Sequence, residues 1–211
     1  MFKLNPAEYD EFIGEVEGRL TEEADYSLEL KRSIDLSTRC KQIPHVIFPV
    51  YYPALSSEKI LTMDWLEGLP LGEFLKTASF TREEGNRLGQ ALWDFYHFQI
   101  HRLRALHADP HPGNFIITND RQLGVIDFGC VKVLPDHFYK NYFQLLDPAL
   151  AESPSRQTKV FHDLRFIYED DSPEEKAFFQ TVFTRLVELL SRPFRTERFD
   201  FSEAGYFTEL F

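Results

Sequence analysis

The chain has 211 residues, of which 43% are hydrophobic and 27% charged, a balance that excludes a disordered chain, a collagen-like repeat and a disulfide scaffold. Its formal net charge is −11, so nucleic acid and anionic lipid head groups, which require a positive surface, are poor candidates for the main ligand. The two cysteines lack metal-site spacing, and the longest apolar stretch, residues 46–55, contains two prolines and is too short to span a membrane.

Capping chemistry and apolar spacing predict a long first helix. Asn5-Pro6 places a cap residue before a proline at the first helical position, and an apolar stripe with helical spacing continues to about Cys40. Gly14 and Gly18 weaken its first half, which leaves a break there open. Residues 45–52 and 59–65 then have the β-branched and aromatic content of strands, with a serine-rich turn between them. The Leu-Pro-Leu-Gly sequence at residues 69–72 is the predicted hinge between two parts of the chain.

A second long helix is predicted from Arg82 to about Arg104, because Thr81–Glu84 has the pattern of a capping box. Its predicted core face consists of Leu88, Leu92, Phe95 and Leu103. Two short apolar runs follow at residues 114–117 and 123–126. An Asn-Asp turn separates them, which predicts a β-hairpin.

The chain after Pro135 is predicted to be helical. A third helix begins with the capping pattern Ser172-Pro173, and its apolar residues are Phe178, Val182, Leu186, Leu189 and Leu190. The phenylalanine-rich helices of this part are interpreted as core. The order of elements predicts an α+β fold in which the helices are segregated from the sheet.

The densest polar cluster lies between the second helix and the hairpin, at residues 107–114 (HADPHPGN). Two prolines and a glycine prevent regular structure there, so we expect an ordered loop with exposed polar side chains. Asp109 and Asn114 belong to this loop, and the hairpin ends in Asp127-Phe128-Gly129. An Asp-x4-Asn pair followed by a hairpin and Asp-Phe-Gly is the layout of a protein-kinase catalytic centre.

That layout gives each of the three polar residues a role. Asp109 is the predicted catalytic residue, which faces the attacking hydroxyl. Asn114 and Asp127 are the predicted metal ligands, because oxygen ligands on rigid strand ends suit Mg²⁺. Phosphoryl transfer needs this arrangement, since charge on the phosphate oxygens must be neutralised while the nucleophile is aligned.

Three segments together resemble the UbiB/AarF family of atypical kinase-like proteins: HADPHPGN at residues 107–114, IDFG at 126–129 and EADYSLE at 23–29. The segment LTMDWLEGLPL at residues 61–71 is also similar to the strand and hinge of that family. The resemblance implies a two-lobed protein-kinase-like fold. Residues 1–68 would be a remnant of the small lobe, and residues 69–211 the helical large lobe.

The resemblance also implies ligands and further site residues. ATP or ADP with Mg²⁺ is the expected cofactor, and ubiquinone or other isoprenoid-lipid metabolism is the expected setting. Glu23 would be the helix glutamate that pairs with a strand lysine. The carbonyl of Asp64 and the amide of Leu66 would face the adenine edge of the nucleotide. The protein is expected in the cytoplasm, with a peripheral position at a membrane or beside a quinone-biosynthesis partner left open.

The sequence departs from the family pattern before residue 23. No KxGQ segment, alanine-rich nucleotide loop or strand lysine can be identified among its 211 residues, so we expect a truncated family member. The segment at residues 129–135 is short and contains no Ala-Pro-Glu signature, so the usual platform for a peptide substrate is missing from it. A small molecule, a lipid or water is therefore the expected acceptor.

Two other functions remain open from the sequence. Without the loop and the lysine, the chain would be a kinase-like binding module with no catalysis. His107, Asp109 and His111 form a His-x-Asp-x-His pattern that could instead hold zinc or manganese in a hydrolase. Mg²⁺-dependent nucleotide binding favours the kinase-like function, and tight metal retention through histidine favours the hydrolase.

Overall fold

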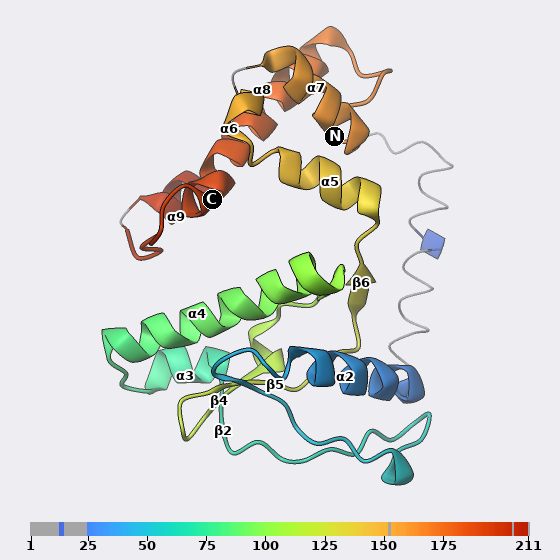
Figure 1. Cartoon of the computed structure of the whole chain (residues 1–211), viewed down its shortest axis with the longest axis vertical. Helices are drawn as coiled ribbons and strands as arrows, with labels where there is room; N and C mark the ends of the chain where they lie inside the picture. Colours follow the sequence, from blue (N-terminus) through green and yellow to red (C-terminus); the bar gives the residue numbers. More distant parts are fainter. Residues whose placement is uncertain (1–12, 15–24, 152, 204, 211) are drawn as a thin grey trace. The chain divides into compact units, whose positions relative to one another are not determined.

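The computed structural model describes residues 13–14, 25–151, 153–203 and 205–210. The chain divides into two compact units, Met1–Leu134 and Pro135–Phe211. The predicted mixture of helices and a small sheet is confirmed (Figure 1). In the described parts of the chain, no helix is long and apolar enough to cross a membrane.

Helix α2 (Tyr26–Cys40) begins where the sequence predicted the middle of a longer helix. Asp25 has an extended backbone, and its side chain accepts hydrogen bonds from the amides of Ser27 and Leu28. An aspartate in that role caps a new helix, so the prediction of one helix from residue 6 to residue 40 is wrong. The predicted cap at Asn5-Pro6 lies outside the described residues.

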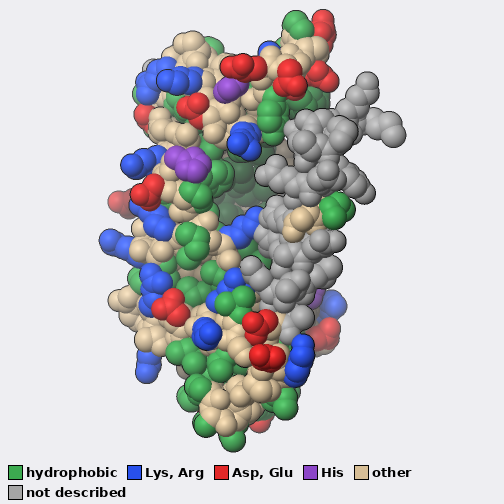
Figure 2. Space-filling model, turned by 90° about the vertical axis from the view of Figure 1, so that its right-hand side faces the viewer, with side chains coloured by type: hydrophobic (Ala, Val, Ile, Leu, Met, Phe, Trp, Pro, Cys, Tyr) green, Lys and Arg blue, Asp and Glu red, His purple; other side chains and the backbone are tan. Residues whose placement is uncertain are grey.

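The two predicted strands at residues 45–52 and 59–65 form only in part. Strand β1 covers Val46–Ile47, a 3₁₀ turn (η1) covers Pro53–Leu55, and a single antiparallel bridge joins Tyr51 to Met63. Pro49 within the first run and Pro53 directly after it lack the N–H groups that a longer ladder requires. This region leaves large apolar side chains in solvent: Val50, Leu55, Ile60 and Trp65. Figure 2 shows hydrophobic side chains gathered at the lower end of its view.

A four-stranded sheet has the order β1-β5-β4-β2, in which β1 runs parallel to β5 and the other pairs are antiparallel. The predicted hairpin is confirmed as β4 (Phe115–Thr118) and β5 (Leu123–Val125). Strand β2 (Gly68–Pro70) approaches β4 so closely that a Cβ atom at residue 68 would overlap the backbone of Ile117. Glycine is therefore required at residue 68, directly before the predicted hinge.

A second, two-stranded sheet pairs β3 (Ala105–His107) with β6 (Val131–Val133). The sequence did not predict either strand. Their pairing places the beginning of the HADPHPGN loop beside the residues that follow Asp-Phe-Gly, with His107 opposite Val131.

Helix α3 (Leu71–Thr77) precedes the long helix α4 (Arg82–Phe98), whose predicted capping box at Thr81 is present. The α-helix ends at Phe98 and continues as a π-helical turn, η2 (Gln99–Leu103). The predicted core face is confirmed, because Leu88 and Phe95 are buried, and Leu92 and Leu103 pack against the same core. Helix α4 packs on β1 and β5 and fixes the position of the loop that follows η2 (Figure 1).

The second unit is helical, as predicted: its elements are α5 (Asp136–Gln144), α6 (Pro148–Ala151), α7 (Pro154–Asp163), α8 (Pro173–Ser191), η4 (Arg192–Phe194) and α9 (Tyr206–Leu210). The predicted capping box at Ser172 is present. The predicted apolar stripe of α8 is correct only at Leu189, which is buried. Phe178 is 63% exposed, while Phe179 and Phe183 pack against the core of this unit. Helix α8 is apolar on two faces, so periodicity alone does not identify the buried one.

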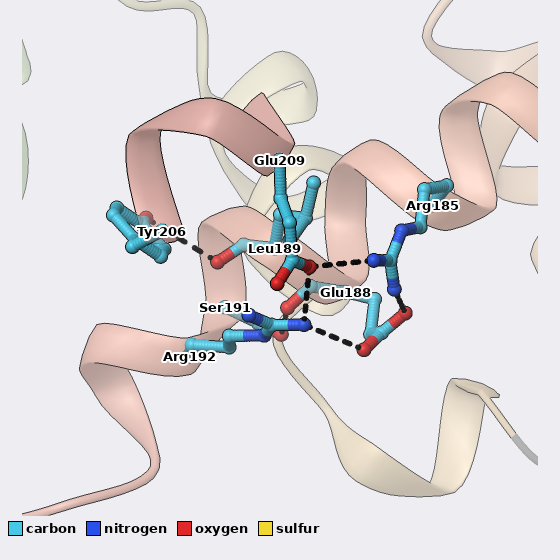
Figure 3. A network of polar contacts seen from close by, with 7 residues as sticks. All are labelled: Arg185, Glu188, Leu189, Ser191, Arg192, Tyr206 and Glu209. Atoms are coloured by element: carbon cyan, nitrogen blue, oxygen red, sulfur yellow. Dashed lines mark hydrogen bonds and ion pairs between the residues drawn. The ribbon is translucent and has the colours of Figure 1, made fainter. Parts of the chain in front are cut away.

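The C-terminal helix α9 is held on α8 and η4 by a polar network (Figure 3). The carboxylate of Glu209 accepts hydrogen bonds from Arg185 at 2.6 Å and Arg192 at 3.0 Å. The hydroxyl of Tyr206 donates to the carbonyl of Leu189 at 3.4 Å. The ion pairs are exposed, so they orient α9 more than they stabilise it.

Candidate phosphoryl-transfer site

The HADPHPGN loop is built by short local turns. A 3₁₀ turn, η3 (Pro112–Asn114), begins after His111, whose Nδ1 accepts the Gly113 amide at 3.0 Å. The amide of His111 in turn donates to the Asp109 carboxylate at 3.3 Å. These contacts give the predicted ordered loop, because proline and side-chain acceptors take the place of a backbone ladder.

Asp109 and Asn114 are in direct contact. The Asn114 side-chain amide donates to the Asp109 carboxylate at 3.0 Å and to the Asp109 carbonyl at 3.1 Å. Asp109 is exposed, whereas Asn114 is half-buried. The amide of Asn114 therefore fixes the orientation of the Asp109 carboxylate at the surface of the loop.

Asp127 is linked to the same loop through the hairpin. The backbone carbonyl of Asn114 accepts the amide of Ile126, the residue before Asp127, at 3.1 Å. The Asp127 carboxylate accepts the Gly129 amide at 2.7 Å. The structure thus places Asp109, Asn114 and Asp127 within one continuous set of hydrogen-bonded turns.

The oxygens that these residues leave available suit a hard cation. In the described part of the chain, no hydrogen bond involves Oδ1 of Asn114 or Oδ2 of Asp127. One is an amide oxygen and the other a carboxylate oxygen, which are the ligand types that Mg²⁺ takes from proteins. The donor set therefore fits the predicted metal.

His107 is a completely buried residue beneath the loop. Its backbone amide donates to the side chain of Gln99 at 2.8 Å, and its Nδ1 lies 3.4 Å from the Tyr96 hydroxyl. Burial lowers the pKa of His107, while the nearby carboxylates of Asp127 and Asp109 oppose that shift. The imidazole is therefore neutral at pH 7, and both carboxylates are close enough to interact with it.

The predicted His-x-Asp-x-His metal site does not form. His107 is buried beside Phe115 and Phe128, whereas His111 is exposed and its Nδ1 caps η3. Across the residues that the structure describes, no three histidine, cysteine or acidic side chains form a group that could hold a metal ion. This geometry gives the hydrolase no ligand set.

Glu29 is a site residue that the sequence analysis missed. A Cβ atom built on Gly129 would lie 3.3 Å from the Asp127 carboxylate and 3.8 Å from that of Glu29. Burial, together with the charge of Asp127, raises the pKa of Glu29. Glu23, the predicted helix carboxylate, lies outside the described residues. The sequence signal for Glu29 was the capping residue Asp25, which begins α2 and places Glu29 in its first turn.

The predicted adenine-facing residues lie on the connection to β2. The Asp64 side chain accepts a hydrogen bond from the Tyr52 hydroxyl at 2.6 Å, and the Asp64 amide donates to the carbonyl of Val50. The side chain of Leu66 packs over Gly124 of β5. Their predicted contacts with a nucleotide stay predictions.

Comparison with known proteins identifies related sequences. A family model described as the ABC1 atypical kinase-like domain matches residues 1–160. The chain is 30% identical over 162 residues to the chloroplastic protein ACTIVITY OF BC1 COMPLEX KINASE 1 of Arabidopsis thaliana, covering 75% of this chain and 23% of that protein. It is 26% identical over 196 residues to the mitochondrial atypical kinase COQ8B of Danio rerio, covering 91% and 30% of the two chains. The chain thus spans less than a third of these relatives.

A solved structure has the same fold. It is the Rv3197 protein of Mycobacterium tuberculosis, determined as a complex with erythromycin. The TM-score is 0.71 with 22% sequence identity, and the match covers 95% of this chain and 49% of that one. This likeness extends over both units and supports the kinase-like fold that the sequence predicted.

Proposed function

Because the chain belongs to the ABC1 atypical kinase-like family, we propose that its loop and hairpin form the metal-binding and catalytic part of an ATP-dependent phosphoryl-transfer or ATP-hydrolysis site. The observation that supports this most directly is the contact between the Asn114 amide and the Asp109 carboxylate. It orients the proposed nucleophile-binding group and leaves the Asn114 oxygen available for a cation.

Each residue has a separate role in the proposed site. Asn114 and Asp127 hold Mg²⁺ through Oδ1 and Oδ2, and the Gly129 amide holds the other oxygen of Asp127 in place. Asp109 orients the attacking hydroxyl or water and accepts its proton. When bound, Mg²⁺ would neutralise charge on the phosphate oxygens.

We assign the role of the helix carboxylate to Glu29. It lies beside Asp127 and Gly129, in the position where a basic group of the phosphate site would be paired. Its raised pKa reflects a carboxylate that is half-buried next to another carboxylate, so a cation at this point relieves an unfavourable pair.

The expected nucleotide affinity of the 211 residues is low. Phosphates are normally held by a glycine- or alanine-rich loop and a lysine, and the sequence contains no identifiable example of either. Losing two or three charge-assisted contacts, each of about 1.5–3 kcal/mol, moves a micromolar site to about millimolar affinity or weaker. We therefore expect metal-dependent binding without appreciable turnover from this chain, for either ATP or ADP.

The acceptor is proposed to be a small molecule, a lipid or water, since the segment after Gly129 has no peptide-docking signature. A connection to ubiquinone or other isoprenoid-lipid metabolism, at the surface of a membrane, is part of the same proposal. It depends on family membership alone.

The test is a titration of Mn²⁺ into the 211-residue chain with ATP, in which electron paramagnetic resonance measures the free metal. Asp127→Ala should weaken Mn²⁺ binding at least about tenfold, because a charged ligand is lost. Asp120→Ala is the matched control, since it removes an exposed carboxylate from the turn of the same hairpin. Equal binding by all three chains, or no binding by the unaltered chain, contradicts the proposal.

A further inference from the structure

Three successive peptide groups after Asp127 are each tied to a different part of the first unit. The Gly129 amide donates to the Asp127 carboxylate at 2.7 Å. The Gly129 carbonyl accepts from the guanidinium of Arg32 at 2.7 Å. The Cys130 carbonyl accepts the amide of Ala108, the residue before Asp109, at 2.9 Å. The turn therefore connects the proposed metal ligand, helix α2 and the catalytic loop.

Of these three hydrogen bonds, the one from Arg32 to the Gly129 carbonyl is not supplied by local structure. Gly129 has the widest backbone freedom of any residue type, so the peptides on its two sides do not fix each other. A partner from outside the turn is needed to hold the 129–130 peptide, and Arg32, 97 residues away in sequence, provides it. A hydrogen bond from a charged donor in a half-buried position is stronger than one between neutral groups.

Arg32 and Glu29 are three residues apart on α2, so they lie on the same helix face. The turn Asp127–Cys130 is opposite that face, with Glu29 next to Gly129 and Arg32 on its carbonyl. Phe128 anchors the turn from below, since it is completely buried against Phe95 and His107. A shift of α2 would therefore move the 129–130 peptide, while Phe128 stays in the core.

We propose that Arg32 is a positioning residue, which holds the Gly129 carbonyl and thereby sets the geometry of the Asp127 carboxylate and the affinity of the site for metal. The inference rests on the proposed function, because it takes Asp127 as a metal ligand. Arg32 itself does not contact the metal or the nucleotide. Its contact with the Gly129 carbonyl couples the position of α2 to the metal site.

The test uses Arg32→Met, which keeps the length of the side chain and removes its donors, and Arg32→Lys, which restores one donor. Arg39→Met is the matched control, because Arg39 is on the same helix and pairs with Asp35 in solvent. Mn²⁺ affinity should fall about tenfold in Arg32→Met, recover in part in Arg32→Lys and stay unchanged in Arg39→Met. Arg32→Gln, with a polar head group, has the same expected result as Arg32→Met and replaces it should that chain not fold.

A second readout is independent of metal. Cys130 adjoins the held peptide, and the other cysteine, Cys40, is buried with a pKa raised to about 12, so a thiol reagent reports on Cys130 in the folded chain. Loss of the Arg32 tie should raise the labelling rate of Cys130 about tenfold through local opening of the turn.

The two readouts separate failure of this inference from failure of the proposed function. Unchanged Mn²⁺ affinity and labelling in Arg32→Met, while the unaltered chain binds Mn²⁺, overturn the role of Arg32 and leave the metal site standing. A chain that binds no Mn²⁺ at all overturns the proposed function and the metal part of this inference. Faster labelling of Arg32→Met in that case still supports the hold of Arg32 on the turn.

Discussion

The buried side chain of Gln99 offers the sharpest test of how the fold positions the catalytic loop. Its Oε1 accepts the backbone amide of His107 at 2.8 Å, and its Nε2 donates to the carbonyl of Phe95 at 3.0 Å. Gln99→Met has a similar shape but leaves the His107 amide without a partner in the core. The Phe95 carbonyl still accepts the backbone amide of residue 99, so the cost comes mainly from His107.

A buried donor left without a partner costs about 1–3 kcal/mol, and we expect that loss in the free energy of unfolding of Gln99→Met. Urea denaturation followed by circular dichroism measures it, with an unchanged m-value as evidence that the unfolded state is the same. Gln90→Met is the control, because Gln90 makes an exposed bond to Asp94 on the same helix, and its change should stay within about 0.5 kcal/mol. Equal losses for the two variants would refute the reasoning.

Three further predictions concern electrostatics. Burial and the charge of Asp127 raise the pKa of Glu29, so the ionised form of Glu29 destabilises the fold increasingly as the pH rises above 4.5. Glu29→Gln should therefore increase the free energy of unfolding at pH 7 but not at pH 4, as measured by urea denaturation. Burial lowers the pKa of His107, so the unfolded chain binds more protons and the stability of the fold should fall as the pH drops below 6.5. His107→Gln should flatten that pH dependence in the same assay. The same pH profile for the variant and the unaltered chain would count against a neutral buried imidazole. Glu209→Gln should lower the free energy of unfolding by less than Gln99→Met does, and this loss should disappear at high salt, because the ion pairs with Arg185 and Arg192 are exposed. A loss of stability that does not depend on salt would contradict this account.

Local chemistry made several elements predictable. The capping boxes at Thr81 and Ser172 depend on residues three apart, and both are present. The hairpin of β4 and β5 follows from two apolar runs and a turn, which are also local signals. The contact between Asp109 and Asn114 could be anticipated because both lie on one short loop, whose two prolines limit its conformations.

Non-local pairing was not predictable from the sequence. Strands β3 and β6 have three residues each, too few for a periodic pattern. The strand run that contains β1 was predicted, but its partner β5 is far away in the chain. The sequence places Gln99 on the apolar side of the second helix, but it does not reveal the partner, because only the return of β3 beneath η2 brings the His107 amide to its side chain. Glu29 was missed because the sequence predicted a helix that begins near residue 6, whereas the side chain of Asp25 caps the start of α2.

In the proposed site, a metal–nucleotide complex would bind between the HADPHPGN loop and the end of β5. Paramagnetic broadening of backbone amide signals by Mn²⁺ with ATP measures this location directly, because the effect decreases steeply with distance from the metal. The account predicts that signals of residues 113–115 and 126–129 are lost first, and that those of residues 119–121, at the other end of the hairpin, persist at the same Mn²⁺ concentration. Equal broadening at both ends of the hairpin, or broadening confined to the second unit, would contradict it.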